Sequence, residues 1–202
     1  MNLARDVLRM LEKNGECLLL VESCTGGLIA SQITKIPGGS KAFAGSLVTY
    51  QVFTKRHVLR SAEAKKITEA SVVSAKTAQV MARDALNLVP HATIAASITG
   101  HMGPDAPPKL DGVFFISVAR RRSRKRGRST ENTVAVVKTK RESVRSTRGR
   151  VHRQKRASQA LLSMVRSLLS SSQKGAKQRR SLDATYGTTN QQLTTNRSKT
   201  KK

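Results

Sequence analysis

The stretch from Cys17 to Ile33 constrains the fold of this chain more than any other part of its sequence. Residues 17–21 form an apolar run of strand length, and Leu28, Ile29 and Ile33 follow at helical spacing. A cluster of small and polar residues separates the two segments. The pattern predicts a buried strand, a tight turn and a helix.

The turn in this unit has the composition of a nucleophile or anion site. Gly26 and Gly27 can adopt backbone angles that are closed to other residues, and N–H groups at a helix start attract anions or a developing oxyanion. Ser23 therefore occupies the place of a nucleophile or phosphate ligand, with Thr25, Gly26 and Gly27 beside it as substrate-binding candidates. The same residue types also cap ordinary helices, so the stretch alone leaves both interpretations open.

The net charge of +26 is divided unevenly along the 202 residues. Residues 1–119 hold 13 Lys and Arg against 9 Asp and Glu, whereas residues 120–202 hold 25 against 3. The first part has the balance of a folded domain, and the second part would be attracted to polyanions. We expect one domain over residues 1–170 and a disordered basic tail over 171–202, where large apolar residues are almost missing.

The cysteine content and the hydropathy pattern indicate a compartment. Cys17 and Cys24 predict no disulfide framework and fit a reducing environment. The sequence shows no N-terminal signal pattern and no apolar run of membrane-spanning length. We therefore expect a cytoplasmic protein that does not contact membranes.

Apolar runs of strand length alternate with helical patterns along the rest of the first 170 residues. Helices are predicted over residues 2–14, 62–66, 73–88 and 143–170, and strands over residues 43–52, 91–98, 113–119 and 133–137. This alternation predicts an α/β fold, a layered sheet flanked by helices. Ligands of such sheets gather beyond the carboxyl ends of the strands. The small-residue loop with Thr99, Gly100 and Gly103 would then supply further donors to the same site.

Several motifs occur in register with those of one known family. They are Glu22-Ser23-Cys24-Thr25-Gly26-Gly27, Pro37-Gly38-Gly39-Ser40, Val48-Thr49-Tyr50 followed by Lys55, and Ser97-Ile98-Thr99-Gly100 ahead of Gly103-Pro104-Asp105. The chain resembles the CinA C-terminal domain family over about residues 3–169, in its short, stand-alone form. Members with known activity are nicotinamide-nucleotide amidohydrolases of pyridine nucleotide salvage. They hydrolyse the carboxamide of nicotinamide mononucleotide to nicotinic acid mononucleotide and ammonia.

The resemblance implies a serine nucleophile, Ser23, assisted by Tyr50 and Lys55, with no metal and no cofactor. Lys55 would have to be neutral, so burial or a neighbouring positive charge must lower its pKa. A tyrosine between the serine and the lysine could relay the proton or orient the lysine. The nucleotide phosphate requires an anion pocket, for which Arg145 lies roughly where the family carries an arginine. The family also tends to self-associate, so we expect a homo-oligomer.

Two alternatives remain open from the residues themselves. Cys24 is a rival nucleophile, because a thiol at a helix N-terminus is intrinsically more reactive. The chain also departs from the family pattern, with Gln51-Val52 in place of Ser-Asn and with His101-Met102 inside the second glycine loop. The second functional hypothesis is therefore a catalytically impaired homologue that binds nucleotides or nucleic acid through its basic C-terminal region, without sequence readout.

Overall fold

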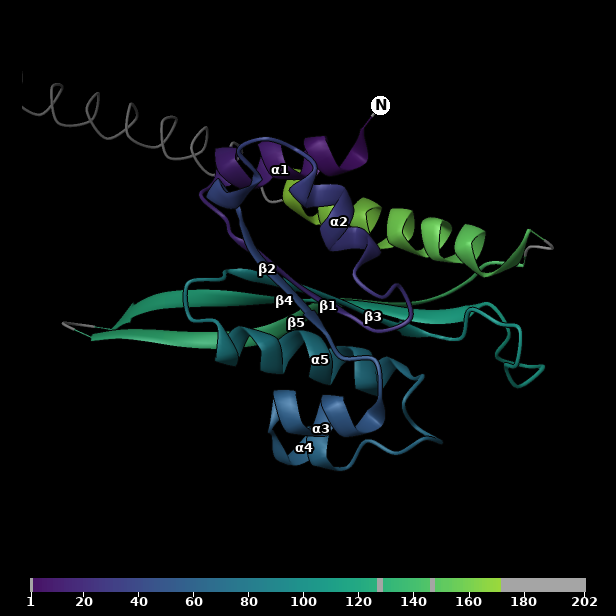
Figure 1. Cartoon of the computed structure of the whole chain (residues 1–202). Coiled ribbons are helices and arrows are strands. Elements are labelled where there is room, and N and C mark those ends of the chain that lie inside the picture. Colours follow the sequence, from purple (N-terminus) through teal and green to yellow (C-terminus); the bar gives the residue numbers. More distant parts are fainter. Residues whose placement is uncertain (1, 127–128, 146–147, 172–202) are drawn as a thin grey trace, which may run out of the picture.

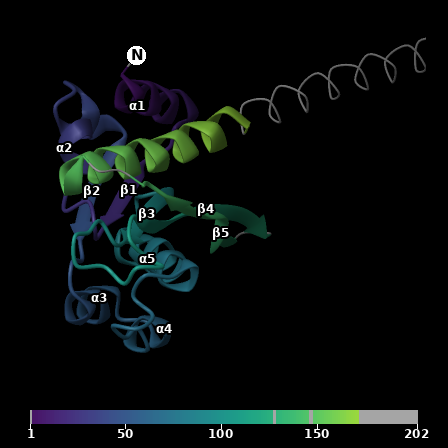
Figure 2. The same ribbon diagram turned by 90° about the vertical axis from the view of Figure 1, so that its right-hand side faces the viewer.

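The computed structural model describes residues 2–126, 129–145 and 148–171. A single five-stranded sheet lies between two layers of helices (Figures 1 and 2). The α/β fold expected from the sequence, a layered sheet flanked by helices, is confirmed. The predicted basic tail, apart from Ser171, lies outside the described residues.

The strands run in the order β2-β1-β3-β4-β5 across the sheet. Their bounds are β1 Leu18–Glu22, β2 Phe43–Val48, β3 Ile94–Gly100, β4 Val113–Arg126 and β5 Ser129–Ser143. β1 pairs in parallel with both β2 and β3, whereas β4 is antiparallel to β3 and to β5. The carboxyl ends of β2, β1 and β3 therefore meet at one edge of the sheet.

Helices lie on both sides of the sheet (Figure 1). One face carries α1 (Leu3–Asn14), α2 (Leu28–Thr34) and a helix over residues 149–171, which we call the C-terminal helix. The other face is covered by α5 (Ala75–Leu88), and α3 (Val52–Leu59) and α4 (Ala62–Lys65) pack on the outer side of α5. A short 3₁₀ turn, Gly39–Lys41, precedes β2. None of the helices in the described ranges is long and apolar enough to span a membrane.

β1 lies at the centre of the packing because both of its faces are apolar. Leu18 and Leu20 join the core under α1, α2 and the C-terminal helix, and Leu19 and Val21 join the core under α5. Side chains alternate between the two faces of a strand, so a run of four apolar residues is what burial on both faces requires. The strand–turn–helix predicted from this stretch is thus the central unit of the fold.

The predicted strand over residues 43–52 is too long, because the strand ends at Val48 and residues 52–59 form α3. This helix had no apolar signature in the sequence. Its buried positions are Val52, Lys55 and Leu59, so a lysine occupies one of the places where an apolar residue would mark a helical face. The helix α3, which the sequence pattern did not predict, places the Lys55 side chain inside the protein.

The bounds of β4, β5 and the C-terminal helix also differ from the predicted ones. β4 and β5 extend well beyond the predicted strands at residues 113–119 and 133–137, because antiparallel pairing continues after the apolar pattern has ended. The predicted basic helix over residues 143–170 begins at residue 149. Arg145 consequently lies ahead of the helix rather than inside it.

Candidate active site

The three parallel strand ends bring the candidate residues together. Glu22, the last residue of β1, pairs with Val48 of β2 on one side and with Ile98 of β3 on the other. Ser23 and Thr49 therefore leave neighbouring strands at the same level of the sheet. The N–H of Thr49 donates to the Glu22 carbonyl at 2.8 Å. This hydrogen bond holds the ends of β1 and β2 next to each other.

The buried carboxylate of Glu22 organises the turn after β1. Its side chain is fully buried and accepts five hydrogen bonds, from the Thr25 and Ser46 hydroxyls and from the N–H groups of Gly27, Ile29 and Ala30. The first N–H groups of a helix have no partner within the helix, and an anion there is also favoured by the helix dipole. Glu22 thus caps α2 from the preceding strand.

This cap overturns part of the predicted oxyanion site. The N–H of Gly27 donates to Glu22 at 3.1 Å, and the N–H of Gly26 donates to the Ser23 carbonyl at 3.1 Å. The Thr25 hydroxyl also donates to Glu22, at 2.8 Å. The two glycines therefore shape the turn, with positive φ angles, rather than offer N–H groups to a substrate.

Two other N–H groups of the turn remain available. Within the described ranges, neither the N–H of Cys24 nor that of Thr25 donates to another residue. Both follow Ser23 directly in the chain. They are therefore the candidate oxyanion donors of this turn.

Lys55 contacts Ser23 directly. Its Nζ lies 2.9 Å from the Ser23 Oγ, 2.6 Å from the Thr49 carbonyl and 3.2 Å from the Tyr50 carbonyl. The lysine side chain is fully buried, and this burial lowers its pKa from 10.5 to about 8. A neutral amine would donate its two hydrogens to the two carbonyls and direct its lone pair at the Ser23 hydroxyl.

Tyr50 lies elsewhere than the predicted proton relay requires. Its side chain is 57 % exposed, and its hydroxyl accepts a hydrogen bond from Arg150 at 2.9 Å. Only its backbone carbonyl contacts Lys55. In this structure no relay stands between the serine and the lysine, and Tyr50 forms part of the wall of the adjoining cavity.

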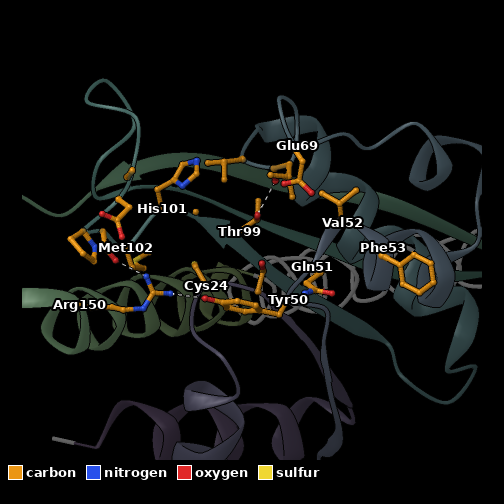
Figure 3. A pocket seen from close by; sticks show the side chains of 18 residues that line it. Cys24, Tyr50, Gln51, Val52, Phe53, Glu69, Thr99, His101, Met102 and Arg150 are labelled. Atoms are coloured by element: carbon orange, nitrogen blue, oxygen red, sulfur yellow. Dashed lines mark hydrogen bonds between the residues drawn. The ribbon is translucent and has the colours of Figure 1, made fainter.

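A cavity of about 680 Å³ opens beside Ser23 (Figure 3). Four segments form most of its wall. They are Ser23 and Cys24 after β1, residues 50–53 between β2 and the start of α3, Glu69, and residues 99–106 at the end of β3 and in the loop that follows. Thr99, Gly100 and Gly103 therefore line the same cavity as Ser23. The Thr99 hydroxyl donates to the Val72 carbonyl at 2.9 Å, so its position is fixed by the protein.

Gly100 is required by close approach of the backbone. A Cβ at this position would lie 2.4 Å from the Cβ of Phe114 on the paired strand β4. Gly103 has a positive φ of 66°, and a Cβ there would lie 2.6 Å from the Arg153 guanidinium. Both glycines thus shape the cavity wall.

The arginine of the site is Arg150, which no pattern in the sequence had indicated. Its guanidinium donates to the Gly103 carbonyl at 2.7 Å and to the Tyr50 hydroxyl at 2.9 Å, at the cavity wall (Figure 3). No carboxylate in the described part of the chain forms an ion pair with it. The predicted Arg145 does not line this cavity and lies in a separate one.

One helical turn after Arg150, Gln154 donates its side-chain amide to the Cys24 carbonyl at 2.9 Å. The i, i+4 spacing places both side chains on one face of the C-terminal helix, toward the turn that contains Ser23. That spacing was the available signal in the sequence. It was hidden because basic residues occur all along this segment.

The rival nucleophile Cys24 is in an unreactive state. Its side chain is 3 % exposed, and burial raises the pKa of its thiol to about 12. Since the thiolate is the reactive form, Cys24 is a neutral thiol at physiological pH. No three His, Cys, Asp or Glu side chains within residues 2–126, 129–145 and 148–171 could hold a metal ion together.

The family model of the CinA C-terminal domain matches residues 1–169. This chain belongs to the CinA C-terminal domain family. The match covers all of the strands and nearly all of the C-terminal helix, so the resemblance drawn from the motifs is confirmed.

Individual relatives agree with the family match. A CinA-like protein of Geobacter metallireducens is 41 % identical over 115 residues, which are 56 % of this chain and 27 % of that protein. A CinA-like protein of Prochlorococcus marinus is 32 % identical over 170 residues, 83 % of this chain and 37 % of that protein. The matched region thus spans only 27 % and 37 % of the length of these two relatives.

Solved structures match over nearly their full length. A CinA superfamily protein of Klebsiella pneumoniae superposes with a TM-score of 0.67 at 25 % identity, covering 83 % of this chain and 96 % of that one. A competence/damage inducible protein of Agrobacterium tumefaciens gives a TM-score of 0.65 at 27 % identity, over 82 % and 93 %. The layered fold is therefore shared with this family.

We predict that Glu22→Gln destabilises the protein. One oxygen of the carboxylate would become an amide group that cannot accept, so N–H or O–H donors around it would lose their partner. The free energy of unfolding should fall by about 2–3 kcal/mol, measured by urea denaturation. The exposed Glu12→Gln on α1 is the control and should change stability by less than about 0.5 kcal/mol. Equal stability of the two variants would contradict the cap.

Proposed function

We propose that this chain is an amidohydrolase that converts nicotinamide mononucleotide to nicotinic acid mononucleotide and ammonia. The observation that carries the proposal is the 2.9 Å contact between the Lys55 amine and the Ser23 hydroxyl at the wall of a cavity. A serine is a poor nucleophile until a base stands beside it, and a buried lysine with a lowered pKa is such a base. Family membership supports the reaction class.

The reaction proceeds in two halves. The Ser23 oxygen attacks the carboxamide carbon while the Lys55 amine takes its proton, and the N–H groups of Cys24 and Thr25 receive the oxyanion. The carbon–nitrogen bond then breaks as Lys55 returns the proton to the leaving nitrogen, which departs as ammonia. Water, deprotonated by Lys55, hydrolyses the acyl-serine, and the proton returns to the Ser23 oxygen.

The charges around the cavity match a substrate with both signs. Arg150 reaches it from the C-terminal helix, and Glu69 reaches it from the segment between α4 and α5, on the opposite face of the sheet (Figures 1 and 3). Nicotinamide mononucleotide carries a phosphate and a cationic pyridinium ring. We assign the phosphate to Arg150, because its guanidinium has donors beyond the two that it uses within the protein.

We expect the purified chain to release ammonia from nicotinamide mononucleotide, and Ser23→Ala and Lys55→Met to reduce kcat by at least about a thousandfold. Cys24→Ala should retain activity, since its thiol is neutral and buried. Lys65→Met, an exposed lysine on α4, is the control for loss of a charge. A folded wild-type chain without amidase activity would refute the proposal. Loss of activity in Cys24→Ala alone would identify Cys24, and not Ser23, as the nucleophile.

The rate should depend on pH through Lys55. Its pKa is lowered from 10.5 to about 8, and the neutral amine is the active form. Below that pKa, kcat/KM should therefore rise about tenfold per pH unit and then reach a plateau above it. A profile measured between pH 6 and pH 10 checks this. A rate that stays constant down to pH 6 would exclude Lys55 as the base.

Arg150→Met should raise KM for nicotinamide mononucleotide about 10- to 100-fold, because a charge-assisted contact to phosphate contributes about 1.5–3 kcal/mol. Nicotinamide riboside lacks the phosphate, so its kcat/KM should be the same in the variant and the wild type. Lys155→Met, exposed on the same helix, is the matched control. If both substrates lose activity equally in Arg150→Met, the arginine has a structural role only.

A further inference from the structure

A second cavity, of about 720 Å³, lies outside the candidate active site. Its wall carries Asp111, Arg145, Arg148, His152, Arg153 and Arg156. None of the residues that line it also lines the cavity beside Ser23. We call this second cavity the arginine cavity.

Positive charge dominates the arginine cavity. Four guanidinium groups line it, and Asp111 is the only carboxylate in its wall. Asp111 is already in an ion pair with Arg153. The wall therefore has an excess positive charge even before His152 is counted, and Arg145 and Arg156 are both exposed to solvent.

Guanidinium groups gathered in one concave surface repel each other unless an anion lies between them. Arginine presents a planar fork of donors that matches phosphate oxygens. The cavity is larger than one phosphate group needs, and its cations come from two segments, the approach to the C-terminal helix and the helix itself. It fits a ligand with several phosphates in a row.

We propose that the arginine cavity binds consecutive phosphates of a nucleic acid backbone. No Phe, Tyr or Trp occurs among its lining residues, so no aromatic surface is available there on which bases could stack. Binding should then be independent of base sequence and steeply dependent on salt. This site does not rest on the proposed amidase activity, because the two cavities share no lining residue.

The test compares two charge reversals of equal size in the full chain. Arg145→Glu with Arg156→Glu changes the arginine cavity, and Arg5→Glu with Arg9→Glu changes two exposed arginines on α1. Both double variants have the same net charge, so any general attraction of the chain for polyanions falls equally in both. Circular dichroism and urea denaturation verify that each variant is folded.

Fluorescence anisotropy of a labelled 12-nucleotide oligothymidine, titrated at several salt concentrations, measures binding. We expect the cavity variant to bind at least about tenfold more weakly than the α1 variant, and the slope of log K against log salt to fall by about 1.4 if two phosphate contacts are lost. Equal affinities of the two variants, or no binding by the wild type at about 50 mM salt, would overturn the proposal.

Competition with inorganic tripolyphosphate distinguishes a nucleic acid ligand from a free polyphosphate ligand. If the site is built for nucleic acid, tripolyphosphate should displace the labelled strand only at higher phosphate concentration than unlabelled oligothymidine. Tighter binding of tripolyphosphate than of the oligonucleotide, lost in the cavity variant, would overturn the nucleic acid assignment in favour of a free polyphosphate ligand.

Discussion

The sheet edge that carries the candidate active site depends on the buried carboxylate of Glu22. Five donors from the turn, from α2 and from β2 converge on it, so one side chain joins the end of β1 to its neighbours. A buried carboxylate is costly unless it is surrounded by donors, and the start of a helix supplies them. The conformation of the Ser23 turn follows from this requirement, because Ser23 is the residue immediately after the carboxylate.

The contact between Ser23 and Lys55 follows from the strand topology and from the burial of a lysine on the inner face of α3. Parallel pairing of β1 and β2 brings their carboxyl ends to the same edge, and α3 begins directly after the second of them. A helix face normally fills such a place with an apolar side chain. Here Lys55 fills it, and two backbone carbonyls satisfy its Nζ atom. Burial that would otherwise destabilise the fold lowers the pKa of the amine, as the proposed role of a base requires.

The sequence was informative where local patterns and burial agree. The apolar run before Ser23 predicted β1, because a strand buried on both faces must be continuously apolar. The same logic failed at residues 52–59, where Lys55 interrupts the apolar face that would have indicated a helix. The pairing of Ser23 with Lys55 could only be expected from family resemblance, since no periodicity links residues 32 positions apart.

The parts of the candidate site that the sequence did not predict depend on contacts between segments far apart in the chain. Arg150 could not be distinguished from the other arginines near it until the C-terminal helix was placed beside the turn. The basic part of the chain therefore contributes to two separate cavities. One face of the C-terminal helix adds Arg150 to the wall of the cavity beside Ser23 and holds the turn through Gln154. Arg153 and Arg156 of the same helix line the arginine cavity, so one helix joins the candidate active site to a cationic surface.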